Sequence, residues 1–156
     1  MVVGIGNPDR GDDGAGRAVA RVLGQMAPDG AEIVEATGEV TELLDLMARS
    51  ATVYVVDACL SGAAPGTIRR FDARERPLPE NTFATSTHGL GLAQAIELAR
   101  TLGQLPRQCI VFAIEGASFD IGAALSPPVD KAVFTVAFQL RREIAAMISV
   151  EATSDA

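Results

Sequence analysis

Residues 4–16 read GIGNPDRGDDGAG, a glycine-rich turn that directly follows a short apolar stretch. A turn of this kind after a buried strand commonly cradles a phosphate, because its backbone amides point at the ligand. The adjacent carboxylates of Asp12 and Asp13 would repel a phosphate. The stretch also lacks the third glycine of the dinucleotide-binding fingerprint. It therefore predicts a strand, a tight turn and a helix whose ligand is attracted by carboxylates.

Along the rest of the chain, apolar strand-like runs alternate with segments whose apolar residues recur at helical spacing. This alternation predicts a parallel sheet covered by helices on both faces. A loop is expected to begin at Arg76 and to continue to Thr87. The expected strands are 1–6, 31–36, 52–58, a short strand ending near 71, and 108–114. The expected helices are 14–25, 41–48, 90–102 and a last helix with Ser126 as N-cap and Pro127 in its first position.

Length and composition fit a single domain, since the chain has 156 residues of which 48% are apolar. We assign residues 1–148 to one α/β domain and expect 149–156 to form a flexible tail. The start MVVGIGNP lacks the features of a signal peptide, and no apolar run reaches the length of about 18 residues that a membrane span needs. The expected location is the cytoplasm.

The charge balance argues against nucleic-acid binding. Thirteen basic and twenty acidic residues give a net charge of −7, and Lys131 is the only lysine. Without a basic run there is no patch to hold a phosphate backbone. Cys59 and Cys109 are too few for a disulfide framework, so reduced thiols are expected.

Three polar side chains are expected to meet at one edge of the sheet. Asp13 follows the first strand, Asp57 ends the third, and His88, the only histidine, precedes the helix near Leu90. In an open parallel sheet, ligands bind beyond the carboxyl ends of the strands, where the strand order reverses. If the order begins 2-1-3, Asp13 and Asp57 face the same crevice.

One imidazole and two carboxylates form a ligand set for a divalent metal such as nickel or zinc, with open positions for substrate. Structural roles stay open beside this interpretation. Asp12 or Asp13 can cap the first helix, Asp57 can pair with a loop amide or an arginine, and His88 can lie on the surface. Cys59 is a candidate fourth ligand or nucleophile, against packing as a small apolar residue.

Four blocks, in this order, resemble the nickel-iron hydrogenase maturation endopeptidases: GIGNPDRGDDGAG, VVDACLSGAAPGTI, STHGLGLAQAIELA and IEGASFDIGAALSPPVDKAV. The resemblance extends from residue 2 to about 148. It implies a flavodoxin-like or phosphorylase/hydrolase-like three-layer α/β/α sandwich with a mostly parallel, twisted sheet of about five strands. It also implies an enzyme that removes a C-terminal peptide from the large-subunit precursor of a [NiFe] hydrogenase.

The resemblance also places the catalytic and metal-binding residues of the family on Asp13, Asp57 and His88. Many members have glutamate at the first position, where Asp13 keeps the oxygen donor. Many carry Asp-Gly-Gly-Thr after the second strand, where residues 35–39 here read EATGE. Nickel is expected to arrive with the precursor, and another divalent metal is expected to replace it in isolation. The glycines of 4–16 are expected to allow a tight turn and the close approach of the partner's backbone.

Three other functions compete with this interpretation. A peptidyl-tRNA hydrolase shares a GIGNP-like start, but it needs an Arg-His-Asn setting and a basic face that this chain lacks. A non-enzymatic nickel carrier or hydrogenase assembly factor would use the same three ligands without shortening any precursor. A cysteine peptidase would pair Cys59 with His88. The preferred hypothesis is a monomeric endopeptidase that docks transiently on its precursor.

Overall fold

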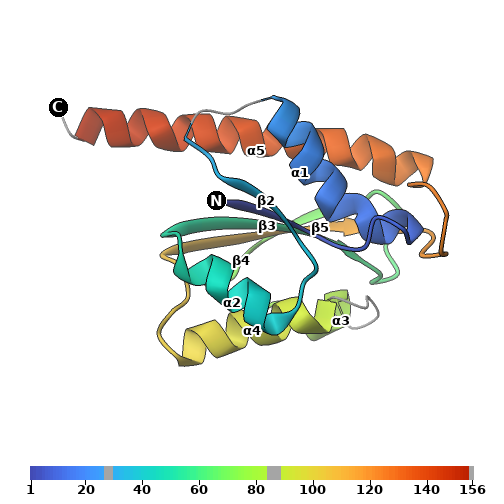
Figure 1. The fold of residues 1–156 in the computed structure, drawn as a ribbon, viewed down its shortest axis with the longest axis horizontal. Coiled ribbons are helices and arrows are strands. Elements are labelled where there is room, and N and C mark those ends of the chain that lie inside the picture. Colours follow the sequence, from blue (N-terminus) through green and yellow to red (C-terminus); the bar gives the residue numbers. More distant parts are fainter. Residues whose placement is uncertain (27–29, 84–88, 155–156) are drawn as a thin grey trace.

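A computed structural model describes residues 1–26, 30–83 and 89–154, and at its centre lies a five-stranded sheet of order β2-β1-β3-β5-β4 (Figure 1). The strands are β1 Val2–Ile5, β2 Ile33–Ala36, β3 Thr52–Cys59, β4 Ile68–Asp72 and β5 Gln108–Glu115. All neighbouring pairs are parallel except β4 and β5, which are antiparallel. The mostly parallel sheet and the order 2-1-3 at its start confirm the sequence prediction.

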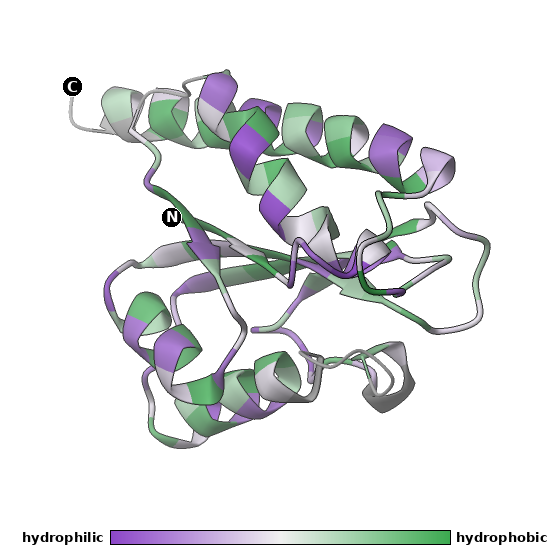
Figure 2. Ribbon diagram, turned by 45° about the vertical axis from the view of Figure 1, so that its right-hand side comes forward, coloured by the Kyte–Doolittle hydropathy of each residue, from purple (hydrophilic) through white to green (hydrophobic). Residues whose placement is uncertain are grey.

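Helices cover both faces of this sheet, which confirms the three-layer sandwich. The short 3₁₀ turn η1 precedes α1, and α1 and α5 pack on one face while α2 and α4 pack on the other (Figure 1). The helical elements are η1 Gly11–Gly14, α1 Ala15–Gln25, α2 Val40–Ala48, α3 Glu80–Phe83, α4 Gly89–Thr101 and α5 Pro127–Ser154. The hydropathy colours show that α1 and α5 carry both hydrophobic and hydrophilic residues, as expected for helices with one buried side (Figure 2).

Side-chain alternation in the central strands divides the core into two parts. Val56 and Phe112 lie in the cluster under α1 and α5, whereas Val55 and Val111 lie in the cluster under α2 and α4. Because successive side chains of a strand point to opposite faces, odd-numbered residues of β3 and β5 face the α2–α4 layer. Asp57 therefore points toward the layer that contains α4.

Glycines bring α1 into direct contact with the backbone of the sheet. A Cβ atom on Gly16 would lie 2.2 Å from the carbonyl oxygen of Val56 and 2.3 Å from that of Ile5. A Cβ atom on Gly4 would lie 2.2 Å from the carbonyl oxygen of Gly16. Only glycine fits at such distances, so these two positions determine how closely α1 approaches β1 and β3.

A third glycine, Gly6, is required by the conformation of the turn after β1. Gly6 has φ +140°, and a Cβ atom there would lie 1.8 Å from the carbonyl oxygen of Asp13. The expectation that these glycines admit the backbone of a partner is therefore wrong at Gly4, Gly6 and Gly16. The space beside each of them is already filled by the chain's own backbone.

A short helix and a longer last helix are the main differences from the expected elements. Within the expected loop of residues 76–87, residues 80–83 form α3, and Phe83 is buried with its ring against Phe71, at 6.4 Å between centroids. Residues 84–87 of that loop lie outside the described part of the chain. Burial of an aromatic side chain explains why this short segment becomes ordered against the core.

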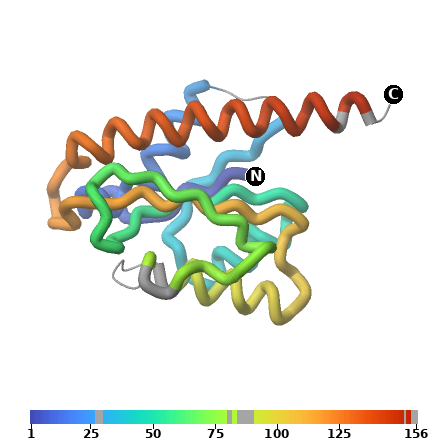
Figure 3. The backbone as a smooth tube through the Cα atoms, turned by 180° about the vertical axis from the view of Figure 1, so that it is seen from behind, coloured from blue at the N-terminus to red at the C-terminus, as the bar shows by residue number. Residues whose placement is uncertain are grey.

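The last helix, α5, continues to Ser154, past the expected domain end at residue 148 (Figure 3). The hydroxyl of Ser149 donates to the carbonyl of Ala145 at 3.0 Å, and that of Thr153 donates to the carbonyl of Ser149 at 2.9 Å. Each hydroxyl donates to the carbonyl one turn earlier in the helix, which is common for Ser and Thr within helices. Among the described residues, no helix combines the length and apolar character needed to span a bilayer.

Candidate functional site

Asp57 is the most unusual charged residue of the described structure. It lies near the carboxyl end of β3 and is completely buried. Burial and the nearby negative charge of Asp13 raise its pKa well above the usual value, although the amide of Ala58 opposes this shift. Neither carboxylate oxygen accepts a hydrogen bond of normal geometry from the part of the chain that the structure describes. An ionised carboxylate is costly in this position unless a proton or a cation neutralises it.

Asp13 lies beside Asp57, as the strand order predicts. It belongs to η1, directly after β1, and is also completely buried. Its amide donates to the carbonyl of Arg10 at 3.1 Å, and Gly6 packs against its carbonyl oxygen. The backbone of Asp13 is thus held firmly while its carboxylate is presented to β3.

The third predicted residue, His88, lies outside the described residues, so its role stays a prediction. The described start of α4 nevertheless packs closely on the loop after β2. A Cβ atom on Gly91 would lie 2.4 Å from the carbonyl oxygen of Gly38. This contact holds the first turn of α4 against the loop that follows β2, at the carboxyl edge of the sheet. Within residues 1–26, 30–83 and 89–154, no three His, Cys, Asp or Glu side chains gather as a metal cluster.

Asp12 has a structural role, but not the expected one. Its carboxylate accepts hydrogen bonds from the amides of Ala117 at 2.7 Å, Ser118 at 3.0 Å and Ser126 at 2.7 Å, and from the Ser126 hydroxyl at 2.9 Å. Burial acts to raise the pKa of Asp12, but these hydrogen bonds outweigh it and hold the pKa below its usual value. Asp12 therefore fastens the loop before α5 to the turn that carries the candidate site.

Neither the Asp12 nor the Asp13 side chain caps helix α1. The N-cap of α1 is Gly14, and no side chain donates or accepts a capping hydrogen bond there. The structural alternative that Asp12 or Asp13 caps α1 is therefore not observed. Ser126 occupies the expected position before Pro127, but its hydroxyl donates to Asp12 rather than serving the helix end.

Sequence reasoning missed Glu115, the last residue of β5, which is buried at the same edge. Its carboxylate accepts hydrogen bonds from the Ser61 amide at 2.8 Å, the Ser61 hydroxyl at 2.7 Å and the Gly62 amide at 2.9 Å. Burial acts to raise its pKa, but the donors hold the pKa below the usual value. An acid that ends an apolar strand was the signal used for Asp57, and the same signal is present in QCIVFAIE.

Cys59 is buried beside Glu115 rather than exposed in a crevice. Its thiol donates to Oε2 of Glu115 at 3.2 Å. Burial and the neighbouring Glu115 carboxylate raise the pKa of Cys59 far above the usual value. Because the thiolate is the nucleophilic form, this environment disfavours Cys59 as a nucleophile.

Residues 35–39, which depart from the pattern of many family members, are held by ion pairs and hydrogen bonds. Glu35 on β2 accepts from Nε of Arg17 on α1 at 2.8 Å. The carboxylate of Glu42 accepts from the amide of Thr37 at 2.9 Å and from its hydroxyl at 2.6 Å. These contacts therefore hold the loop after β2 in place at the carboxyl edge of the sheet.

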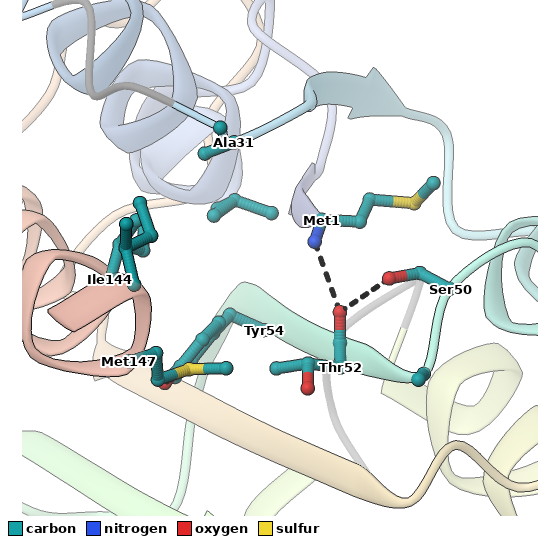
Figure 4. Close-up of a pocket in the computed structure, with 11 residues that line it drawn as sticks. Met1, Ala31, Ser50, Thr52, Tyr54, Ile144 and Met147 are labelled. Carbon is teal, nitrogen blue, oxygen red and sulfur yellow. Dashed lines mark hydrogen bonds between the residues drawn. The ribbon is translucent and has the colours of Figure 1, made fainter. Parts of the chain in front are cut away.

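A cavity of about 220 Å³ lies at the opposite, amino edge of the sheet (Figure 4). The amino group of Met1 donates there to the carbonyl of Thr52 at 3.0 Å, and the Tyr54 hydroxyl donates to the sulfur of Met147 at 3.2 Å. Its described lining combines apolar side chains with polar groups of Met1, Ser50, Thr52 and Tyr54, and it contains no carboxylate. Because this cavity holds no acid, the paired acids Asp13 and Asp57 are a better candidate for chemistry.

Comparison with known proteins identifies the family. A family model for hydrogenase maturation proteases, HycI, matches residues 17–143. The chain belongs to the hydrogenase maturation protease family. Its members are named as proteases, which places this protein among the peptide-bond hydrolases and confirms the family prediction.

Individual relatives agree with this assignment. The hydrogenase 2 maturation protease of Escherichia coli K12 is 30% identical over 133 residues, covering 83% of this chain and 80% of that protein. The hydrogenase expression/formation protein HupD of Thiocapsa roseopersicina is 25% identical over 155 residues, which are 97% of this chain and 70% of that protein. The chain is also 27% and 26% identical to two hydrogenase expression/formation proteins, from Azotobacter chroococcum and Azotobacter vinelandii, and spans 63% and 64% of their length.

A solved structure confirms the fold. The hydrogenase maturating endopeptidase HybD from E. coli superposes with a TM-score of 0.72 at 26% identity, covering 89% of this chain and 87% of that chain. The maturation protease therefore shares the α/β sandwich of HybD over nearly its whole described length.

Proposed function

We propose that this maturation protease removes a C-terminal peptide from the large-subunit precursor of a [NiFe] hydrogenase after nickel has been inserted. The observation that carries the proposal is the buried pair Asp13 and Asp57 at the carboxyl edge of the sheet. Burial and the nearby charge of Asp13 raise the pKa of Asp57, and a divalent cation beside the pair would stabilise the ionised carboxylate. In this proposal the protein works as a cytoplasmic monomer that docks transiently on the precursor.

The donor set fits nickel that belongs to the substrate. Asp13 and Asp57 supply oxygen donors and negative charge, and His88 supplies an imidazole, which suits nickel. Another divalent metal takes its place when the protease is alone. Since both carboxylates are completely buried, contact with the nickel of a partner requires a local rearrangement of the chain that covers them.

The hydrolytic step then needs a water molecule and a proton acceptor. In the proposed role, the three residues orient the nickel of the precursor and so place the scissile bond at the edge of the sheet. A carboxylate takes a proton from water as the oxygen adds to the peptide carbonyl. That proton passes to the leaving nitrogen as the carbon–nitrogen bond breaks. Asp57 suits the proton transfer because burial raises its pKa above the usual value, which makes its carboxylate a stronger base.

The decisive experiment follows the mass of a purified large-subunit precursor from the same organism, with and without nickel, during incubation with the protease. We expect loss of one C-terminal peptide from the nickel-loaded form alone. Loss from both forms would show that nickel is not required. Binding of the loaded precursor without any mass change would favour a nickel carrier or assembly factor and overturn the proposal.

Cys59 offers a direct test of the competing cysteine mechanism. We expect Cys59→Ser to retain at least about half of the wild-type cleavage rate, because serine keeps a donor toward Glu115. A cysteine nucleophile would instead lose about 10²-fold or more on this change. The measurement is the initial rate with nickel-loaded precursor, with Cys109→Ser, a change at the other buried thiol, as the matched control.

A further inference from the structure

Ile121 is a large aliphatic side chain that the fold leaves almost entirely in solvent. It is 86% exposed and lies in residues 116–126, the segment between β5 and α5. Single exposed apolar residues are common on protein surfaces. The position of this one on a rigid turn beside the candidate site distinguishes it from the others.

Ile121 occupies the corner of a tight turn. The amide of Ala123 donates to the carbonyl of Asp120 at 3.2 Å, and Gly122 has φ +80°. This combination is typical of a type II turn, in which Ile121 takes the first corner. A β-branched apolar side chain at such a corner contributes no burial to the fold, and turns generally favour other residues there.

The turn is fastened to the segment that carries Asp13. The amide of Gly122 donates to the carbonyl of Asp9 at 2.7 Å, and that of Gly11 donates to the carbonyl of Ala123 at 3.2 Å. The four hydrogen bonds to the Asp12 carboxylate hold both ends of the same segment. Ile121 is therefore held at a defined place relative to the candidate site, so little conformational entropy is lost when it is buried by a partner.

The charged residues nearest to Ile121 in the chain and across its turn are Asp120, Asp9 and Arg10. We define the apolar rim as residues 62–67 and 116–128, which contain Asp120 as their only charged residue although the whole chain has a net charge of −7. Gly66 joins the two segments, because a Cβ atom there would lie 2.6 Å from the carbonyl oxygen of Pro128. The exposed apolar residues of the rim are Ala64, Pro65, Ala117, Ile121, Ala124, Pro127 and Pro128.

Both segments of the rim lie at the same end of the sheet as the turn between β1 and α1 (Figure 1). The rim is thus a rigid surface with a single charged residue, Asp120, that borders the candidate site in a strongly acidic protein. Interface centres are typically depleted of charge and well ordered, and a few apolar anchors carry most of the binding energy.

We propose that the apolar rim is the docking surface for the folded body of the large-subunit precursor, with Ile121 inserted into an apolar pocket of that partner. This docking role rests on the proposed function, since the rim can guide the precursor only if the precursor is the substrate. Recognition then has two parts. Asp13 and Asp57 contact the metal, and the apolar rim binds the protein surface around it.

The test compares Ile121→Ser with Leu102→Ser. Leu102 is a matched control because it is also aliphatic and 55% exposed, but it follows the end of α4 at the opposite edge of the sheet. Steady-state cleavage of purified nickel-loaded precursor gives KM and kcat for each variant. We expect Ile121→Ser to raise KM about tenfold with kcat within about twofold of wild type, and Leu102→Ser to change neither.

Other outcomes separate this docking role from the proposed function. An unchanged KM in Ile121→Ser would overturn the docking role while leaving the proposed function standing. A fall in kcat at unchanged KM would assign Ile121 to the chemical step and also overturn it. Ile121→Val should restore the wild-type KM, since it keeps a branched apolar side chain, and equal melting temperatures would show that all variants fold. Wild-type protease that fails to cleave the loaded precursor would overturn both proposals before any variant is compared.

Discussion

Asp57→Asn is expected to abolish cleavage and at the same time to stabilise the protein. The substitution keeps the size of the side chain but removes its negative charge and its ability to take up a proton. Loss of a general base or of a charged metal contact lowers rates by about 10²–10⁴-fold. We expect Asp13→Asn to have a similar effect on the rate, because both carboxylates address the same cation.

The stability effect follows from the pKa of Asp57. Its folded-state pKa lies well above the usual value of an aspartate. A carboxyl group with a raised folded-state pKa contributes stability below its unfolded pKa and loses that contribution as the pH rises through the folded value. Each unit of pKa shift corresponds to about 1.4 kcal/mol. The melting temperature of Asp57→Asn should therefore exceed that of wild type at neutral pH, and the difference should shrink toward pH 4.

Thermal unfolding at several pH values and intact-mass cleavage assays measure the two effects. The matched control is Asp45→Asn, the same chemical change at an exposed position on α2, which should alter neither property. Wild-type cleavage by Asp57→Asn would contradict the proposed role of this residue. A melting temperature below that of wild type at neutral pH would instead show that a partner satisfies the ionised carboxylate.

Gly16→Ala is expected to have the largest effect on folding. Its new methyl group would lie 2.2 Å and 2.3 Å from two backbone oxygens of the central strands, and neither oxygen can move without shifting its strand. Overpacking of a core costs about 1–3 kcal/mol and sometimes more. We expect a loss at or above the top of that range, which is a fall of about 6–12 °C in melting temperature for a chain of this size.

Gly24→Ala in the same helix is the matched control. No heavy atom lies within 4 Å of a Cβ atom at Gly24, and alanine is favoured over glycine in helices by about 0.5–1 kcal/mol. Its melting temperature should therefore rise by a few degrees, about 2–4 °C per kcal/mol. If both variants melted at the same temperature, the close contact between α1 and the sheet would not limit stability.

Much of the fold follows from local pattern in the chain. The alternation of apolar strands with amphipathic helices predicted the layers, and the strand order placed Asp13 beside Asp57. The position of Asp57 at the end of an apolar strand made it a candidate site residue, because an acid there must be neutralised or paired. Glu115 carries the same signal, but the sequence alone does not show whether such an acid meets a ligand or the backbone of a loop.

The different partners of Asp12 and Asp13 could not be predicted from the local sequence. The two acids are adjacent and chemically identical, yet Asp12 binds amides far along the chain, at Ala117 and Ser126, while Asp13 faces β3. Sequence spacing predicts neighbours within one helix or strand, but hydrogen bonds across such separations depend on how complete elements pack.

The sequence by itself determined the sandwich and the family and predicted the candidate site at the carboxyl edge, because these depend on periodicity and on short motifs. Tertiary structure alone decided which acid is structural, that Cys59 is buried against Glu115, and that the glycines of residues 4–16 serve the chain's own packing. It also placed Ile121 on a rigid turn beside the site. These features arise from contacts between distant segments, and such contacts exist only once the sheet and its helices have assembled.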